Sequence, residues 1–451
     1  MTKKEQLFYL AVNLLSAILL VMETGGTGEN AKSVVLVVLS LLMIPEPVTF
    51  LPVLFVSSWS ISFVAMPGIA AFFYYLALFF VSLILDRKQS VFYFESFPAE
   101  AKIALLLSLW IFVTGFFSLS GVWNSALKVA LYVVPVFLVS RSSIRDLEFC
   151  RSSMVVIAAV FSVYFFYISL FAPVEFINET DDFTIDPNHV QFNSLGRNIN
   201  PNTASQYVLL LFIILYSEAF RAKKYWIIIL AACNIVTLMY LGSRTAFFSM
   251  VVVAVVYLIL ILKTSVVNKI LLLSAMVGVF LVIYSQFGRF ERSDRLRLST
   301  VYEDEGSGRF VTWTILFNDV IPKHLMKGIG VGSQNYVEAG VYMRGTYKDA
   351  DNLYIDVLTQ MGIIGLALFI LFYVLVLRNL IKYRKVKRDW DFLLAVFLAY
   401  LVEGLGETVF DTPMFWFLGL MVMIAINDLK ESDEEELESD EEEPVVEVVE
   451  E

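Results

Sequence analysis

The sequence predicts an all-α polytopic membrane protein with about fourteen transmembrane helices. Hydrophobic residues make up 58% of the 451-residue chain, and charged residues make up only 17%. The mean hydropathy is +0.72. A chain with so little charge cannot cover a water-soluble globule with polar surface, so a soluble protein is excluded. Apolar runs that approach 20 residues recur along the chain, and a helix of about that length crosses the hydrocarbon core.

About fourteen apolar runs satisfy this criterion, within an expected range of about 12 to 14. They cover residues 7–22, 33–45, 48–66, 68–85, 103–119, 123–140, 154–172, 204–220, 225–241, 245–263, 268–287, 353–378, 391–408 and 412–428. The first run is followed by ETGGTGEN and not by a cleavage pattern, so we interpret it as a span. IPEP, around Pro45 and Pro47, is either a tight turn or a break in one long element.

Lys and Arg in the short connections predict the orientation, because these residues concentrate on the cytoplasmic side. With Lys3 and Lys4 inside, alternation of the spans places every basic short connection in the cytoplasm. These connections carry Arg87, Lys88, Arg141, Arg145, Arg151, Arg221, Lys223, Lys224, Lys263, Lys269 and the cluster from Arg378 to Arg388. Both termini are therefore expected to be cytoplasmic.

The same alternation places four connections on the outer face. They are residues 173–203, the corner at residues 242–244, residues 288–352, and GETVFDTP at residues 406–413. A connection as long as 288–352 is uncommon unless it is functional or forms a small domain. We therefore expect residues 1–430 to form one membrane domain whose functional residues gather in the outer connections.

Residues 431–451 differ in composition from the rest of the chain. This stretch, ESDEEELESDEEEPVVEVVEE, holds 13 of the 44 acidic residues and no base. Like charges with few large apolar residues predict a disordered, solvated cytoplasmic tail. Cys150 and Cys233 lie far apart, and His189 and His324 each stand alone, so we expect neither a disulfide framework nor a metal site or other cofactor.

Two outer segments have predictable local structure. SGRFVTWTILFNDVIP predicts a helix that Ser307 caps and Pro322 ends, with Arg309 in its first turn, where a cation is unfavourable unless an anion binds nearby. GIGVGSQNY, at residues 328–336, follows no strand of a βαβ unit, so a nucleotide loop is excluded. We expect instead a flexible turn that approaches a substrate. Asp351 or Asn352 then caps the next span.

Two outward-facing arginines suggest an anion site. Arg244, in the corner LGSRTAFFSM, and Arg309 are suited to forked binding of phosphate oxygens, with Arg197 as a third candidate. At the outer leaflet the natural anion is a lipid-linked phosphate or diphosphate. A nearby carboxylate could deprotonate a sugar hydroxyl while the arginines stabilise the departing diphosphate. The alternative for Arg244 is that it only reaches toward lipid headgroups.

Four stretches resemble, in this order along the chain, the signature of the O-antigen ligase and O-antigen polymerase superfamily. They are GRNINPNTAS at 196–205, GSRTA at 242–246, GRFVTW with PKHLMKGIGVG between 308 and 332, and DNLYIDVLTQMGIIG at 351–365. The resemblance implies a metal-independent glycosyltransferase that uses undecaprenyl-diphosphate-linked glycans in the bacterial cytoplasmic membrane. It also implies that Arg244 and Arg309 engage the diphosphate.

The family commonly has His before Asn in the third motif, where this chain has Asp351 before Asn352. Either Asp351 serves as the base, or the base is Glu403, Glu407 or Asp411 at the outer end of a late span. We predict Arg244, Arg309 and Asp351 as catalytic residues. Candidate substrate-binding residues are Arg197, Asn202, Ser243, Gly330, Asn352 and Tyr354.

We interpret the chain as a polysaccharide polymerase for capsule or O-antigen repeat units. A ligase that transfers glycan to a lipid or protein acceptor is the second hypothesis. A transporter or flippase of the same glycolipids is the third, but it predicts mid-span charges and paired broken helices. The expected partners are lipid-linked oligosaccharide and polysaccharide and membrane lipid, with a chain-length regulator and a flippase as candidates, and no nucleic acid.

Overall fold

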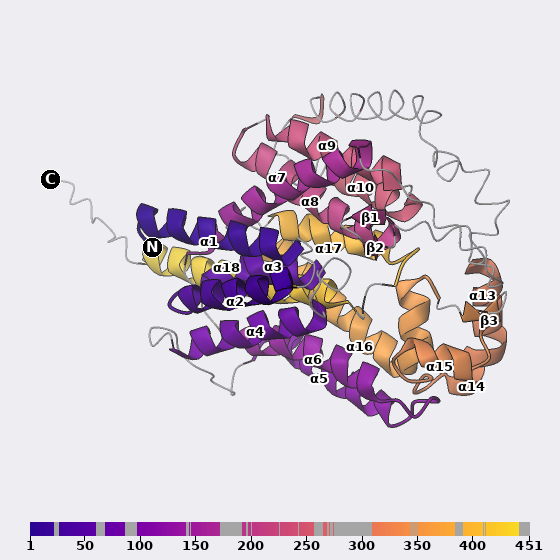
Figure 1. The fold of residues 1–451 in the computed structure, drawn as a ribbon. Coiled ribbons are helices and arrows are strands. Elements are labelled where there is room, and N and C mark those ends of the chain that lie inside the picture. Colours follow the sequence, from indigo (N-terminus) through magenta and orange to yellow (C-terminus); the bar gives the residue numbers. More distant parts are fainter. Residues whose placement is uncertain are drawn as a thin grey trace.

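The computed structural model describes most of the chain, with gaps. Described are residues 1–21, 27–59, 68–85, 97–140, 144, 146–171, 192–194, 197–199, 201–224, 226–241, 243–256, 265–267, 270, 274, 309–343, 346–347, 350–383, 391–408, 410 and 412–441. In these ranges the regular structure is helical apart from two short antiparallel hairpins, with turns between the elements (Figure 1). The predicted all-α class is therefore confirmed for the described residues.

The helices of the first half follow the predicted spans closely. They are α1 (Lys3–Val21), α2 (Thr27–Met43), the 3₁₀ turn η1 (Pro47–Thr49), α3 (Phe50–Trp59), α4 (Gly68–Leu85), α5 (Ala99–Gly115), α6 (Asn124–Val139) and α7 (Leu147–Phe171). IPEP separates α2 from η1, because Pro47 suits the first turn of a helix but not its interior. The sequence is therefore a break between two helical elements.

The second half begins with a hairpin of β1 (Phe192–Ser194) and β2 (Arg197–Ile199). Three helices follow, α8 (Pro201–Arg221), α9 (Ile227–Leu241) and α10 (Arg244–Val256). The outer segment holds α13 (Arg309–Ile315), the π-helical η6 (Leu316–Val320), α14 (Ile321–His324), α15 (Ser333–Glu338), β3 (Tyr342–Met343) and β4 (Thr346–Tyr347). The last helices are α16 (Leu353–Tyr383), α17 (Asp391–Glu403) and α18 (Pro413–Glu441). Apart from residues 270 and 274, the predicted span at 268–287 lies outside the described residues.

Several helices have the length and composition that a membrane requires. Among the described residues, four are long and apolar enough to cross a bilayer, namely α1, α7, α8 and α16. Others, such as α4, α6, α9 and α10, are apolar but shorter. These helices are compatible with a membrane protein, and the total of about fourteen spans stays a prediction.

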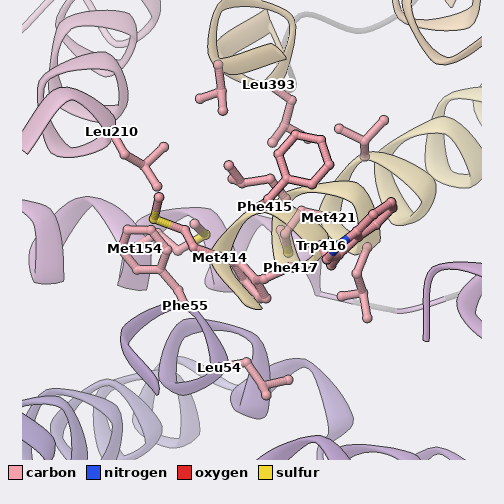
Figure 2. Packing of buried hydrophobic residues seen from close by; sticks show 14 of the residues in the cluster. Leu54, Phe55, Met154, Leu210, Leu393, Met414, Phe415, Trp416, Phe417 and Met421 are labelled. Carbon is pink, nitrogen blue, oxygen red and sulfur yellow. The ribbon is translucent and has the colours of Figure 1, made fainter. Parts of the chain in front are cut away.

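The centre of the bundle is α18. Residues 413–426 are buried on every side, as expected for a helix that is apolar all round. Figure 2 shows Met414, Phe415 and Phe417 of this helix lying among side chains from several other helices. These neighbours are Leu54 and Phe55 of α3, Met154 of α7, Leu210 of α8 and Leu393 of α17. Close packing of large apolar side chains at this centre holds the helices of the bundle in place.

Contacts between distant residues show which connections between helices lie at each end of the bundle. At one end the N-terminal amine pairs with Asp146 at 3.0 Å, and the Asn427 side chain donates to the Val139 carbonyl. At the other end, the outer segment meets the α5–α6 corner, where the Leu119 amide donates to Ile329. Figure 1 shows the N-terminus at the end of the bundle opposite α13, α14 and α15. These groupings match the predicted alternation, and the assignment of the cytoplasmic side stays a prediction.

The outer segment has a small core of its own. It consists of Leu316, Val320, Ile321, Ile329, Tyr336, Val341 and Ala350. The expectation that Pro322 ends the helix is wrong, because helical backbone continues through η6 into α14 as far as His324. Pro322 stands in the first turn of α14, where no intrahelical amide is needed, and the wider π turn precedes it. The expected cap, Ser307, lies outside the described residues.

The glycine-rich turn at 328–332 has a different use from the expected one. Helix α16 is kinked at Gly362, where φ is 66°. The turn donates to the carbonyls that the kink leaves free, from the Ile329 amide to Thr359 and from the Gly330 amide to Gln360. Gly330 is buried, and a Cβ on it would lie 2.6 Å from the Cα of Ser118. This part of the turn is therefore packed against the protein, and an approach of the turn to a substrate stays a prediction.

The acidic tail is helical where it begins. Helix α18 continues through residues 431–441, so the prediction of disorder is wrong for this part. The remaining tail residues, 442–451, lie outside the described residues. Glu is a good helix former, and extension of an existing helix avoids the cost of nucleation. A charged segment joined to a buried helix therefore inherits its conformation.

We predict that Gly362→Ala lowers the thermal stability of the detergent-solubilised protein strongly. A Cβ at this position would lie 2.4 Å from the Met326 carbonyl oxygen, and the positive φ adds strain of about 1–2 kcal/mol. Gly340→Ala is the matched control, because Gly340 also has a positive φ (79°) but has open space around it. A melting temperature that falls equally in both variants would contradict the proposed contact between the turn and the kink.

Candidate functional site

The segment before α16 presents Asp351 from a constrained backbone. Asp351 has φ of 43°, a left-handed conformation that is unfavourable for a residue other than glycine. Its neighbours fix it on both sides. The Ala350 carbonyl accepts a hydrogen bond of 2.6 Å from the Trp313 indole, and Asn352 is bonded to helix α16. The conformation of Asp351 is therefore imposed by the fold, as is common at functional sites.

Asn352 supplies the cap that was expected of either Asp351 or Asn352. Its Oδ1 accepts from the amides of Tyr354 and Ile355, each at 3.0 Å. Its Nδ2 donates to the Leu405 carbonyl at 2.9 Å. Asn352 is therefore a structural link as well as a cap, and the Asp351 carboxylate is left for another partner.

That partner is Arg309, the first residue of α13. Its Nη2 lies 3.1 Å from Glu407 Oε1, and its Nε lies 3.5 Å from Asp351 Oδ2. The three side chains are 22%, 12% and 26% exposed for Arg309, Glu407 and Asp351. The group is half-buried, so its ion pairs are screened less than those of a fully exposed surface.

The 404–407 turn, between α17 and α18, is where these elements meet. Besides the bond from Asn352 to Leu405, the Leu353 amide donates to the Gly404 carbonyl at 2.7 Å. The turn itself is closed by the amides of Gly406 and Glu407, which both donate to the Glu403 carbonyl. The start of α16 and the ion pair of Arg309 are thus attached to the same four residues.

Arg244 adjoins the same turn from a third direction. It begins α10, and the Ser243 side chain caps this helix by accepting from the Ala246 amide at 3.5 Å. The next residue, Thr245, packs directly on Gly406, where an added Cβ would lie 2.6 Å from the Thr245 hydroxyl oxygen. The structure therefore places the start of α10, where Arg244 lies, against the same 404–407 turn that Arg309 contacts through Glu407.

A second carboxyl group lies behind this turn. Glu403, the last residue of α17, is fully buried, and its Oε2 accepts from the Ser249 hydroxyl of α10 at 3.0 Å. Its Oε1 has no hydrogen-bond partner. The bond to Ser249 ties α17 to α10 just below Arg244, so Glu403 contributes to the spacing of the two elements that carry the site.

The other predicted site residues are more scattered. Arg197 lies in β2, Asn202 lies in the first turn of α8, and Gly330 is packed against Ser118 as described above. The Tyr354 hydroxyl donates to the Leu401 carbonyl at 2.8 Å, which places it against α17 near the turn.

Neither histidine stands where the family has its own. His324 ends α14, and its pKa is lowered by desolvation and by the charges of Lys327 and Lys323. His189 lies outside the described residues, as does the alternative base Asp411. Among the residues described, no group of three or more His, Cys, Asp or Glu side chains could hold a metal ion.

Glu407 is the functional candidate that sequence reasoning undervalued. It stood only as one of three alternative bases, because motif order does not reveal which acid a distant arginine pairs with. The available signal was its place in GETVFDTP, which alternation of the spans puts on the same face as Arg309. Together the residues form a guanidinium with two carboxylates, a set that can bind an anion and accept a proton.

Comparison with known proteins supports the reading of the motifs. Residues 228–370 match the family model described as O-Antigen ligase. Arg244, Arg309 and Asp351 all lie within this match, whereas Glu403 and Glu407 lie beyond it. No curated protein matches the chain. The match covers three of the four motifs and supports the resemblance to the O-antigen ligase and O-antigen polymerase superfamily, whereas GRNINPNTAS at 196–205 lies before the matched residues.

Proposed function

We propose that the protein is a polysaccharide polymerase of the bacterial cytoplasmic membrane. It transfers a growing glycan from undecaprenyl diphosphate to a lipid-linked repeat unit at the outer face, and both termini lie in the cytoplasm. The observation that carries the proposal is the cluster of Arg309, Asp351 and Glu407 on a turn that Arg244 flanks. This cluster stands at the end of a bundle of apolar helices, in a superfamily whose members act on lipid-linked glycans.

The chemistry requires one proton acceptor and one anion site. An acceptor hydroxyl oxygen attacks the anomeric carbon of the donor glycan, and the bond from that carbon to the diphosphate oxygen breaks. The hydroxyl proton passes to a carboxylate, for which we propose Asp351. The electron pair leaves with the diphosphate, whose charge is stabilised by the guanidinium groups of Arg309 and Arg244.

Asp351 is preferred to the other carboxylates for geometric reasons. Glu403 is fully buried and engaged with Ser249, so an acceptor sugar cannot reach it directly. Glu407 is less exposed than Asp351, at 12% against 26%, and lies closer to Arg309. The imposed backbone conformation at Asp351 also fixes the direction in which its short side chain leaves the main chain, which limits the positions of the carboxylate and lowers the cost of reaching the reactive geometry.

Elongation by the purified protein distinguishes the candidate functions. Given only a synthetic undecaprenyl-diphosphate-linked repeat unit, a polymerase yields longer lipid-linked chains. A ligase yields product only after a separate acceptor is added. Movement of the glycolipid across vesicles without a new glycosidic bond would instead show a transporter and would rule out the proposed enzyme.

We predict that Arg309→Ala and Arg244→Ala each abolish elongation, a loss of at least about 100-fold, because the leaving diphosphate loses its charge partner. Arg244→Lys should also lose most activity, since a point charge lacks the forked geometry of a guanidinium. The measurement is the product ladder formed by equal amounts of membrane-inserted protein. Full-length polymer from either Ala variant would remove that arginine from the proposed site.

For Asp351, the informative comparison is between two substitutions. Asp351→His should retain part of the elongation activity, because imidazole is also a base at neutral pH, whereas Asp351→Asn should lose it. His324→Gln is the control and should remain active, because His324 lies in α14 and has no role in the proposed chemistry. Equal activity of the Asn and His variants would place the base elsewhere, with Glu407 as the next residue to test.

A further inference from the structure

We propose that Glu407 is a placeholder for the donor diphosphate. In the substrate-free protein its carboxylate occupies the edge of Arg309 that a diphosphate oxygen takes when the donor binds. The donor displaces Glu407, and Glu407 returns to help release the product diphosphate. This inference rests on the proposed function, because it assumes that Arg309 binds a diphosphate.

The first support is the way Arg309 is occupied. Glu407 Oε1 lies 3.1 Å from Nη2, within hydrogen-bond distance, so it covers part of the guanidinium fork. The Nε atom, in contrast, is buried and has no hydrogen-bond partner, since Asp351 Oδ2 stands 3.5 Å away. A guanidinium offers five donors in one plane. Arg309 is therefore anchored at one edge by an anion and left with an unsatisfied donor, which the several oxygens of a diphosphate could satisfy.

The second support is the balance of charge. Two carboxylates face one guanidinium, so with both acids ionised the trio carries a formal charge of −1. A diphosphate that simply joined this trio would meet two like charges at close range in a half-buried site, which is costly. Movement of one carboxylate away from Arg309, or its protonation, therefore lowers the cost of binding the diphosphate.

The third support identifies which carboxylate moves. The backbone at Asp351 is fixed by its neighbours, through the Trp313 bond to Ala350 and the bonds of Asn352 to α16 and to Leu405, and its short side chain has only two torsions. Glu407 closes the turn through its backbone amide, and its longer side chain can rotate without breaking that bond. Displacement of Glu407 also leaves Asp351 in place as the proposed base.

The two possible roles of Glu407, placeholder and positioning residue, lead to opposite expected effects of one substitution on diphosphate binding. Glu407→Gln keeps the shape of the side chain and an acceptor oxygen but removes the charge. If Glu407 competes with the ligand, this variant binds diphosphate about two- to fivefold more tightly, as loss of one partly exposed ion pair implies. If Glu407 merely orients Arg309, binding weakens. In the elongation assay, the placeholder role lowers both KM for the donor and kcat, because product release slows.

The test measures binding of inorganic pyrophosphate to the purified full-length protein in lipid nanodiscs by titration calorimetry. The variants are Glu407→Gln, Arg309→Ala, and Glu338→Gln as the control. Glu338 is an exposed residue of α15 in the same outer segment, so its substitution makes the same change of charge away from Arg309. The melting temperature of each variant confirms that it is folded.

We expect tighter binding for Glu407→Gln, unchanged binding for Glu338→Gln and no measurable binding for Arg309→Ala. Equal or weaker binding by Glu407→Gln, together with loss of binding by Arg309→Ala, would overturn the placeholder role and leave the diphosphate site standing. Unchanged binding by Arg309→Ala would instead overturn the proposed function at this residue. The same tightening in Glu338→Gln would show a general effect of net charge and would also end the placeholder proposal.

Discussion

The ion pair between Arg309 and Glu407 joins two parts of the chain that are 98 residues apart. One part is the outer segment with its own small core, and the other is the turn between the last two helices of the bundle. Because residues 413–426 of α18 are buried on all sides at the centre of the bundle, the turn before them has little freedom to shift. Through Glu407, Arg309 is therefore held in place by the tightly packed centre of the bundle. A site that must orient a charged headgroup requires such a rigid support.

The rest of the site follows from the same turn. Thr245 packs on Gly406, Leu353 donates to Gly404, and Asn352 donates to Leu405. Each contact uses backbone or a small side chain, so the three approaching elements come as close as their main chains allow. The charged side chains of Arg309, Asp351 and Glu407 are left at the margin of this packing. The packed apolar interior thus keeps the site rigid, and the charged side chains at its margin are the groups that can bind an anion or accept a proton.

Much of the fold was predictable because apolar runs and basic connections are read locally along the chain. What could not be predicted depends on contacts between distant residues. The kink of α16 at Gly362 receives its hydrogen bonds from the glycine turn near residue 330, so a motif that suggested substrate contact is used for packing. Pro322 continues a helix because a π turn precedes it, and the acidic residues 431–441 are helical because α18 extends into them. In each case tertiary context overrides local preference.

In the site, too, the locally encoded residues were predictable and the contacts between distant residues were not. Motif order placed Arg244, Arg309 and Asp351 together as candidates, and spacing alone could not select Glu407, because no sequence rule tells which acid meets an arginine almost a hundred positions away. The replacement of the family His by Asp351 gains a physical meaning once Glu407 is included. A neutral imidazole beside Arg309 and Glu407 leaves a balanced pair, whereas a carboxylate in its place adds one negative charge. A chain that uses Asp351 as its base must therefore offset that charge when an anionic donor arrives, and a second carboxylate that can leave the arginine is a direct way to do so.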